Sequence, residues 1–463
     1  MRTWIGWAVA VATTAAVPGG ATAQTLEDAL VEAYTVNAHL LAARAALRAV
    51  DETVPAALSG WRPTLEISSN AGKRALRQSG IFGDGSTQNM SPASVGVRLS
   101  QPLFRGGATM AQTQASEARV LAGRASLTEV EQQVLAASAS AYVTVIRDQS
   151  VIDLNVNNEQ VLARQLQATR DRFHVGEVTR TDVSQAEARS ADARASRIAA
   201  EGNLEASRAT YENLIGTAPG TLEFPTMSVF SVPETVEAAL DLGLRRNPAV
   251  LRADALAAAA RHDIDAAAAR VLPHITLSAS AQRSWDPNSF SSKTDVAEIV
   301  TSLVVPLYQS GAEYARIREL REVAVQRRRE VDAERRSIRE SVAQGWERLQ
   351  TARARVSAFQ ASVEANGIAL EGVEQEAAVG ARTVLDVLDA EQELFEARVN
   401  LVRAEAEAAT ATFQLLSVAG GMTARELALP TPLYDPVAHY DAVRGKWLGF
   451  GGDGEAEPTA AAE

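Results

Sequence analysis

Val-Gly-Glu-Val-Thr-Arg-Thr-Asp-Val at residues 175–183 reappears as Val-Gly-Ala-Arg-Thr-Val-Leu-Asp-Val at residues 379–387, an offset of 379 − 175 = 204. Both copies continue with Ala-Glu, and each lies between two long stretches that are poor in Gly and Pro. Those stretches are rich in Ala, Glu, Arg, Gln and Leu, a composition typical of long helices. Gly176 and Gly380 can adopt the left-handed conformation that ends a helix. The two copies therefore predict the tips of two helical hairpins.

The outgoing helix of each hairpin begins near residues that stabilise a helix N-terminus. These are Thr181 or Asp182 in the first copy and Thr383 or Asp386 in the second. Their oxygens can accept hydrogen bonds from the free N–H groups of the first turn, and a carboxylate there also faces the positive end of the helix dipole. One such turn is a weak signal, whereas two at one spacing are a strong signal.

The tips belong to a wider tandem repeat. Gln-Pro-Leu-Phe at residues 101–104 corresponds to Val-Pro-Leu-Tyr at 305–308, again offset by 204. Nearer the start of each copy the offset is 210, as for Asn37 and Asn247. The second copy is therefore six residues shorter (210 − 204), and the loop-like run 79–86 is the kind of segment that tolerates such a change. We infer a duplication with one loop trimmed.

Composition excludes several classes of function. The net charge of −12 and the pI of about 5.2 argue against a nucleic-acid partner. The absence of Cys excludes disulfides, thiol catalysis and Cys-based metal sites. The five His residues are scattered, with no pair at metal-ligand spacing. No carboxylate, His and nucleophile recur as a set, so we expect neither an enzyme nor a cofactor.

The first 23 residues are predicted to be a signal peptide. Arg2 precedes the apolar segment 4–12, and Ala-Thr-Ala at 21–23 supplies small residues before Gln24. A membrane anchor needs about 20 apolar residues, and this segment is too short. No later stretch is long enough to span a membrane as a helix. The mature chain is therefore expected to begin near Gln24, outside the cytoplasm.

Two segments with period-two alternation predict strand hairpins, at about 61–103 and about 273–306. Apolar and polar residues alternate in 61–68 and 94–100, and again from residue 274, with a less regular strand at 296–305. Strands of this length with one apolar face suit a membrane β-barrel, the alternative being the edge of a soluble sandwich. Four strands cannot close a barrel, because the smallest membrane barrels have about eight. A barrel must therefore be shared between protomers.

The remaining helices are predicted from uninterrupted stretches. Residues 106–174 and 311–378 are each predicted to form one helical rod. At a helical rise of about 1.5 Å per residue, each rod is on the order of 100 Å long. The returning helices, at about 182–215 and 383–419, are half as long. The opening helices of each repeat, within 25–59 and 235–270, are suited to stack on the unpaired parts of the rods. A heptad seam in the second rod comprises Val342, Leu349, Val356, Val363 and Leu370.

These elements define an expected domain organisation. Residues 24–216 form the first repeat and 233–420 the second, each with an opening helix, a strand hairpin, a long helix, a tip and a returning helix. A linker covers 217–232. An equatorial segment and a disordered tail cover 421–463, the Gly/Ala/Glu-rich composition after residue 449 being typical of disorder. Trp447 and Phe450 either anchor this tail against the body or are exposed.

The chain resembles the TolC family of outer-membrane efflux channel proteins. The resemblance rests on the signal peptide, the duplicated helix–hairpin–helix units, Pro-Leu-Phe and Pro-Leu-Tyr at the strand-to-helix joints, and the paired Val-Gly-x5-Asp-Val tips. It covers residues 25–430, and residues 379–389 are its most specific stretch. It implies a mainly α fold with membrane β-structure, in which a homotrimer forms a 12-stranded barrel in the outer membrane of a Gram-negative bacterium. A helical tunnel continues this barrel through the periplasm.

The resemblance also implies partners. These are the outer-membrane lipid, a periplasmic adaptor protein and an inner-membrane transporter that supplies the energy. Many relatives carry a lipidated N-terminal Cys, and this sequence has none. Anchoring would then rest on the barrel alone.

Individual positions match the family's periplasmic entrance. Asp386 and Asp389 correspond to an acidic pair that narrows the pore, where six carboxylates around a threefold axis would hold cations. Arg382 corresponds to a latch residue that bonds Thr181 and Asp182 at the first tip. The aromatic gate residue expected three positions before the second tip Gly is Ala377 here, so that part of the latch is absent.

The tips themselves match the adaptor-contact positions of the family: Val175, Gly176, Val379 and Gly380. The predicted function is a passive exit duct of a tripartite efflux system for small molecules. An exit duct for type I protein secretion shares this architecture and remains an alternative. A periplasmic coiled-coil adaptor or scaffold is the alternative from another class, but it would lack two amphipathic strand pairs.

Overall fold

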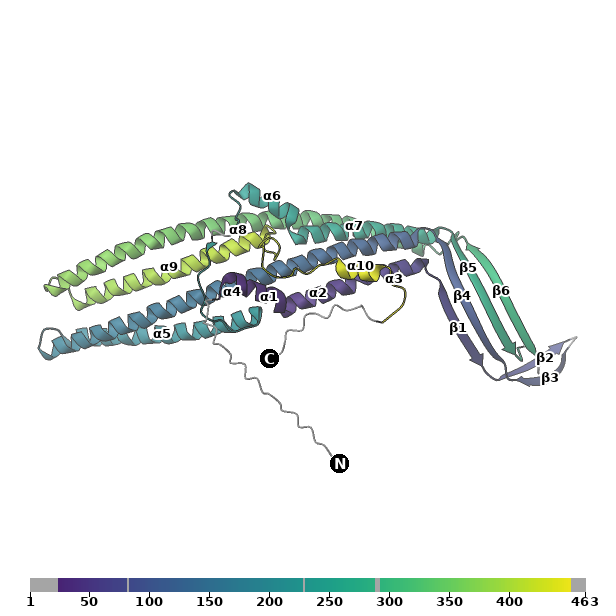
Figure 1. The fold of residues 1–463 in the computed structure, drawn as a ribbon, viewed down its shortest axis with the longest axis horizontal. Coiled ribbons are helices and arrows are strands. Elements are labelled where there is room, and N and C mark those ends of the chain that lie inside the picture. Colours follow the sequence, from purple (N-terminus) through teal and green to yellow (C-terminus); the bar gives the residue numbers. More distant parts are fainter. Residues whose placement is uncertain (1–23, 81–82, 228–229, 288–291, 451–463) are drawn as a thin grey trace, which may run out of the picture. The chain divides into compact units, whose positions relative to one another are not determined.

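The computed structural model describes residues 24–80, 83–227, 230–287 and 292–450 (Figure 1). The predicted signal peptide and most of the predicted disordered tail lie outside these residues. The elements in chain order are α1 (Leu26–Val36), α2 (Ala38–Asp51), α3 (Thr53–Leu58), η1 (Ser59–Trp61), β1 (Thr64–Ala71), β2 (Arg74–Gly80), β3 (Gly83–Met90), β4 (Ala93–Arg105), α4 (Ala108–His174), α5 (Arg180–Ile215), α6 (Val236–Arg246), α7 (Pro248–Ala268), η3 (Ala269–Val271), β5 (His274–Trp285), β6 (Lys293–Val304), α8 (Ala312–Ala378), α9 (Val384–Val418) and α10 (Ala438–Arg444).

The chain forms two compact units, and each unit draws residues from both sequence repeats. Unit 1 comprises Met1–Ala33, Ala137–Phe230 and Ala352–Thr410. Unit 2 comprises Tyr34–Ala136, Ser231–Thr351 and Ala411–Glu463. The tips lie in unit 1 and the strands lie in unit 2. The sequence repeats and the compact units are therefore two different divisions of the chain.

The long helices have the predicted lengths. Helices α4 and α8 have 67 residues each, and the returning helices α5 and α9 have 36 and 35. No Pro and few Gly interrupt them, so nothing in their sequences opposes helix propagation. The mainly helical architecture with long duplicated hairpins is thus confirmed.

The opening helices of each repeat share a capping device. Asn37 accepts hydrogen bonds from the N–H groups of His39 and Leu40 at the start of α2, and Asn247 accepts one from Ala249 at the start of α7. Asn is among the best N-cap residues, because its short side chain reaches the free N–H groups of the first turn. The repeat offset of 210 therefore reflects a break between two helices at the same place in each copy.

Four helices of unit 2 share an apolar core. It joins α6 and α7 to α8 and α9, which confirms that opening helices stack on the rods. Its fully or nearly fully buried members are Ala239, Val250, Ile338, Val342, Leu349, Ala411 and Leu415. Two heptad positions, Val342 and Leu349, are completely buried, and the other three are half-buried.

Four strands form one antiparallel sheet in the order β1-β4-β5-β6 (Figure 1). The two predicted hairpins are present as β1–β4 and β5–β6, and β4 pairs with β5 to join the repeats. Strands β1 and β6 remain at the edges with unpaired backbone groups. A second, two-stranded sheet of β2 and β3 occupies part of the segment that the sequence predicted as a loop. Its Gly, Ser and Asn residues favour turns, and this composition concealed the strand pairing.

The register gives the sheet one apolar and one polar face. Cross-strand pairs on the apolar face include Leu65↔Leu99, Leu99↔Ala279 and Ala279↔Ile299. The row beside it reads Glu66↔Arg98↔Ser280↔Glu298 and is polar throughout. Because side chains alternate between faces, odd-numbered residues of this central region form the apolar face. Among the helices of the described residues, none is both long and apolar enough to cross a membrane.

Candidate entrance site at the hairpin tips

The first tip ends α4 with two backbone hydrogen bonds around a left-handed glycine. Gly176 has φ of 82°. Its N–H donates to the Phe173 carbonyl at 3.0 Å, and the Glu177 N–H donates to the Arg172 carbonyl at 2.9 Å. These bonds form a Schellman motif, which satisfies the last carbonyls of the helix. The predicted left-handed turn is confirmed.

The outgoing helix α5 is capped by Thr179, two residues earlier than the predicted Thr181. The Thr179 hydroxyl accepts from the Asp182 N–H at 3.3 Å, and the Asp182 carboxylate accepts from the Thr179 N–H at 2.7 Å. This reciprocal pair is a capping box. The Asp182 carboxylate also accepts from the Thr179 hydroxyl at 2.8 Å, and the hydrogen bonds from the Thr179 N–H and hydroxyl lower the pKa of Asp182, because both favour the carboxylate. Asp182 therefore stabilises the N-terminus as predicted, from the third helical position.

The second tip repeats this geometry. Gly380 has φ of 81°, and N–H groups of Gly380 and Ala381 donate to the carbonyls of Ala377 and Glu376 at 3.1 and 2.9 Å. Thr383 and Asp386 form the same reciprocal pair, with bonds of 2.8 and 3.2 Å. The predicted roles of these two residues at the start of α9 are confirmed. Both tips present an apolar side chain to solvent, since Val175 is 73% and Val379 is 81% exposed.

The acidic pair is early in α9, but its two members have different partners. The Asp386 carboxylate accepts from the Thr383 N–H and hydroxyl, which lowers the pKa of Asp386 and keeps it ionised at neutral pH. Asp389 accepts from Arg189 of α5, with an Nη2–Oδ1 distance of 2.7 Å. The sequence reasoning missed Arg189, because the two residues are 200 positions apart.

An apolar contact beneath the pair fixes α9 against the first hairpin. Leu388 is 1% exposed and packs with residues of both α4 and α5. The buried members of this cluster are Leu162, Ala186, Ala193 and Leu388, and Leu166 and Val384 pack against it. The Ala residues bring the backbones of the helices close together. The position of Asp389 next to Arg189 follows from this packing.

Each tip also carries one local ion pair. Arg382 donates from Nε to Glu376 at 2.8 Å, and Arg172 donates from Nε to Glu177 at 3.2 Å. In the single chain the predicted latch partners are not brought together, since Arg382 is bonded to Glu376 and Asp182 to Thr179. All four ion-pair side chains are about half exposed. Such pairs contribute about 0–1 kcal/mol each.

Glu391 lies in α9 two residues after Asp389, in an environment that the sequence did not reveal. Glu391 is half-buried, and its Oε2 is enclosed without a hydrogen-bond partner among the described residues. The pKa of Glu391 is raised to about 7, mainly by burial and in smaller part by the negative charge of Glu374, and Arg164 opposes this rise. Its position within an Ala- and Glu-rich helix gave no signal for this environment.

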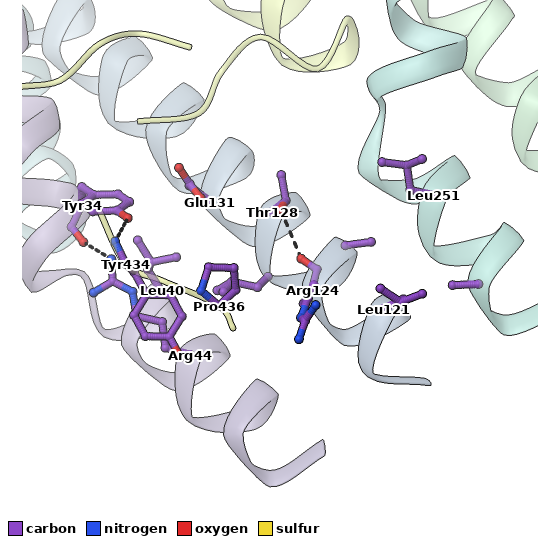
Figure 2. A pocket seen from close by; sticks show the side chains of 13 residues that line it. Tyr34, Leu40, Arg44, Leu121, Arg124, Thr128, Glu131, Leu251, Tyr434 and Pro436 are labelled. Atoms are coloured by element: carbon purple, nitrogen blue, oxygen red, sulfur yellow. Dashed lines mark hydrogen bonds between the residues drawn. The ribbon is translucent and has the colours of Figure 1, made fainter. Parts of the chain in front are cut away.

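Unit 2 contains a separate cavity of about 510 Å³ between α2, α4, α7 and the C-terminal segment (Figure 2). The Arg44 guanidinium lies 4.6 Å from the Tyr34 ring centre and 5.1 Å from that of Tyr434. Glu131 accepts from the Ala424 N–H, and burial raises the pKa of its carboxyl group. The Thr128 hydroxyl in the same lining donates to the Arg124 carbonyl at 3.1 Å. Within the described residues there is no cluster of three or more potential metal ligands.

Comparison with known proteins identifies the family. The family model described as "Outer membrane efflux protein" matches residues 29–217 and 239–421. The outer membrane efflux protein BepC of Brucella suis is 35% identical over 93% of this chain and 92% of its own length. The alkaline protease secretion protein AprF of Pseudomonas aeruginosa is 25% identical over 72% of this chain and 70% of its own. The solved outer-membrane channel OprN matches with a TM-score of 0.75 and 21% identity, covering 86% of this chain and 90% of its own.

The chain belongs to the TolC family of outer-membrane efflux channels, as its sequence predicted. It is an efflux channel protein of the Gram-negative outer membrane with a periplasmic extension, and not an enzyme. Membership of this family implies a homotrimer.

Proposed function

We propose that the chain is the passive exit duct of a tripartite system, receiving small molecules from an inner-membrane transporter through a periplasmic adaptor. The proposal rests on two paired features. The four-stranded sheet has two open edges, which three copies would join into a closed barrel of 12 strands. The two tips have one backbone geometry and each exposes a Val, as a repeated contact surface for an adaptor requires.

The entrance assignments extend this proposal. Asp386 and Asp389 of three protomers would form the narrowest, cation-holding part of the pore. This assignment is supported by the exposure of Asp389, by the position of both residues in the first turns of α9 and by the lowered pKa of Asp386. Arg382 has donors besides the one bonded to Glu376, and in the trimer these would reach Thr181 and Asp182 of a neighbouring hairpin. The tip residues Val175, Gly176, Val379 and Gly380 would contact the adaptor.

The tandem division of the chain is part of the same proposal. Residues 24–216 and 233–420 would be structurally equivalent repeats, joined by 217–232 and followed by 421–463. The equal lengths of α4 and α8 support this division, as do the two matched ranges of the family model.

The absence of Cys allows a direct test of the tips. Val175→Cys and Val379→Cys, each carrying a photo-crosslinker, should capture the adaptor in cells. Ile198→Cys on α5 is a matched control, because it is 53% exposed but distant in sequence from either tip. Crosslinking of Ile198→Cys alone would overturn the tip assignment.

Oligomer size tests the shared barrel. The purified protein in detergent should have about three times the mass of the mature chain, since open sheet edges make a folded monomer prone to aggregate. A well-behaved monomer would contradict the barrel closure.

Type I protein secretion is a second candidate function, favoured by the similarity to AprF. A gene deletion distinguishes efflux of small molecules from protein secretion, if drug accumulation in the cells and the amount of secreted protein are both measured. Loss of secretion with unchanged drug accumulation would replace efflux by protein export.

A further inference from the structure

The C-terminal segment after α9 is bonded to the helices of unit 2. The Tyr434 N–H donates to the Tyr34 hydroxyl at 3.0 Å. Helix α10 packs on α2 and α3, and its Val443 is 1% exposed (Figure 1). Arg444 donates to Glu117 of α4 at 3.1 Å. These contacts give the segment a defined course along unit 2.

The course of this segment ends at the base of the sheet. Arg62 donates from Nη1 to the Lys446 carbonyl at 2.7 Å, and its guanidinium carbon lies 5.0 Å from the centre of the Trp447 ring. A guanidinium at this distance from an indole is stabilised by the ring electrons. Arg62 is two residues before β1 begins at Thr64. Trp447 is therefore held where the helical part of the unit meets the strands.

Apolar side chains beyond this contact face solvent. Trp447 is 65%, Leu448 89% and Phe450 fully exposed. The same end of the sheet carries other exposed apolar side chains, Trp61, Leu307 and Tyr308. The pairings Thr64↔Ser100 and His274↔Val304 place the start of β1 and the end of β6 at this end of the sheet. The chain is thus held by Arg62 at Lys446 and Trp447. It presents large apolar or aromatic side chains at positions 447, 448 and 450, with Gly449 between the last two.

The lipid of the outer membrane fits this surface better than another protein chain does. The sheet spans the outer membrane with its apolar face towards lipid, and its helical end faces the periplasm. Aromatic side chains concentrate at the level of the lipid headgroups, where the ring is apolar and its polar edge is hydrated. Arg62 and Lys446 beside the rings supply positive charge at the level of the lipid phosphates. The surface is therefore continuous with the membrane-embedded face of the sheet.

We propose that Trp447, Leu448 and Phe450 insert into the periplasmic-side interface of the outer membrane and act as a C-terminal membrane anchor, positioned by Arg62. Three copies in the trimer would surround the base of the barrel. The proposed anchor requires that the protein lies in the outer membrane, as its family does. It does not require the proposed pore constriction, latch or adaptor contacts.

A fluorescent probe on Leu448→Cys tests the proposal in the full-length trimer. The labelled protein is reconstituted in vesicles of phosphatidylethanolamine and phosphatidylglycerol, with quenchers placed either on the lipid at headgroup depth or in the water as iodide. Val325→Cys on α8 is a matched control, since Val325 is 53% exposed and lies away from the sheet in sequence. We expect lipid-borne quenchers to reduce the Leu448 signal at least about threefold more than the Val325 signal, and iodide to show the opposite order.

Two outcomes would overturn the proposal. Iodide quenching of the Leu448 probe equal to that of the control would show that the segment is in water. Protection from both quenchers would show that a neighbouring protomer covers it. A second variant, Arg62→Gln, should leave the trimer intact but shift the Leu448 probe towards the aqueous pattern, and an unchanged pattern would remove Arg62 from the anchor.

Discussion

The two hairpin tips have the same backbone but different charges. At both, a left-handed Gly and a Thr–Asp capping box form the turn, with matching hydrogen bonds. The two tips differ in the side chains that they carry at equivalent positions. Arg172 in the first tip corresponds to Glu376 in the second, because 376 − 172 = 204, so the charge at this position is reversed. The ion-pair partners, Glu177 and Arg382, are at positions that do not correspond.

Two of the proposed entrance residues, Asp389 and Arg382, have no counterpart of the same type in the first tip. The position of Asp389 is Gln185 in the first copy, and that of Arg382 is Val178, both at the offset of 204. Asp386 differs, since its counterpart Asp182 forms the same capping box. The comparison separates residues that build a tip from residues that distinguish one tip from the other. Asp386 belongs to the first group and is also charged, whereas Asp389 and Arg382 belong to the second.

Removing the shared backbone feature should have the largest effect. Gly176→Val or Gly380→Val forces a β-branched residue into a left-handed turn, where a side chain costs about 1–2 kcal/mol and distorts the tip. We expect export to be lost while trimer assembly and membrane insertion persist, as measured by a transport assay and by size in detergent. Gly202→Val in α5 is the control, because a side chain there meets open space at ordinary helical φ. Normal export by both tip variants would show that the turn geometry is dispensable.

Reversing one charge at each tip should have the next largest effect. The change in conductance should differ between the first tip and the second. Arg382→Glu removes the proposed latch and places a second acid beside Glu376, so we expect single-channel conductance in planar bilayers to rise several-fold. One exposed pair contributes about 0–1 kcal/mol, but three copies that open together can shift the closed state by a few kcal/mol. The matched variant Arg172→Glu repels Glu177 in the same way without touching the latch. Equal increases in both channels would assign the effect to tip repulsion alone.

Neutralising the acidic pair should change selectivity more than conductance. Asp386→Asn with Asp389→Asn removes six carboxylates from the proposed constriction, so cation selectivity and block by multivalent cations should weaken. Asn still accepts the capping hydrogen bond, which preserves the turn. Asp192→Asn removes an exposed carboxylate of α5 that belongs to neither the constriction nor the latch, and it should leave reversal potentials unchanged. Unaltered selectivity in the double variant would mean that the pair faces away from the pore.

The smallest expected effect is a pH dependence at Glu391. Its counterpart in the first tip, Glu187, is paired with Arg170, whereas Glu391 lies near the negative charge of Glu374. The pKa of Glu391 is raised from 4.5 to about 7, so the folded state favours the neutral acid. Stability from this group is complete below about pH 4.5 and is lost as pH rises through about 7. Glu391→Gln should flatten the pH profile of trimer melting between pH 5 and about 8. A profile identical to the wild type would show that Glu391 is solvated.

Sequence alone determined the features that depend on local backbone preferences. A left-handed turn needs Gly, which identified Gly176 and Gly380. Uninterrupted helix-forming sequence gave the long rods, and alternation of apolar and polar residues, less regular in 296–305, gave the four strands of the main sheet. Their recurrence at offsets of 204 and 210 gave the duplication and, through resemblance, the family.

Only the tertiary structure decided which distant side chains meet. The capping role of Thr179 instead of Thr181 depends on where the turn places the first helical N–H groups. The Arg189–Asp389 pair requires Leu388 to pack against two helices of the other repeat. The contact of Arg62 with Trp447 joins residues 447 − 62 = 385 positions apart. Local sequence specifies a helix or strand through its own few residues, whereas these pairings follow from the close packing of whole elements, which no local pattern records.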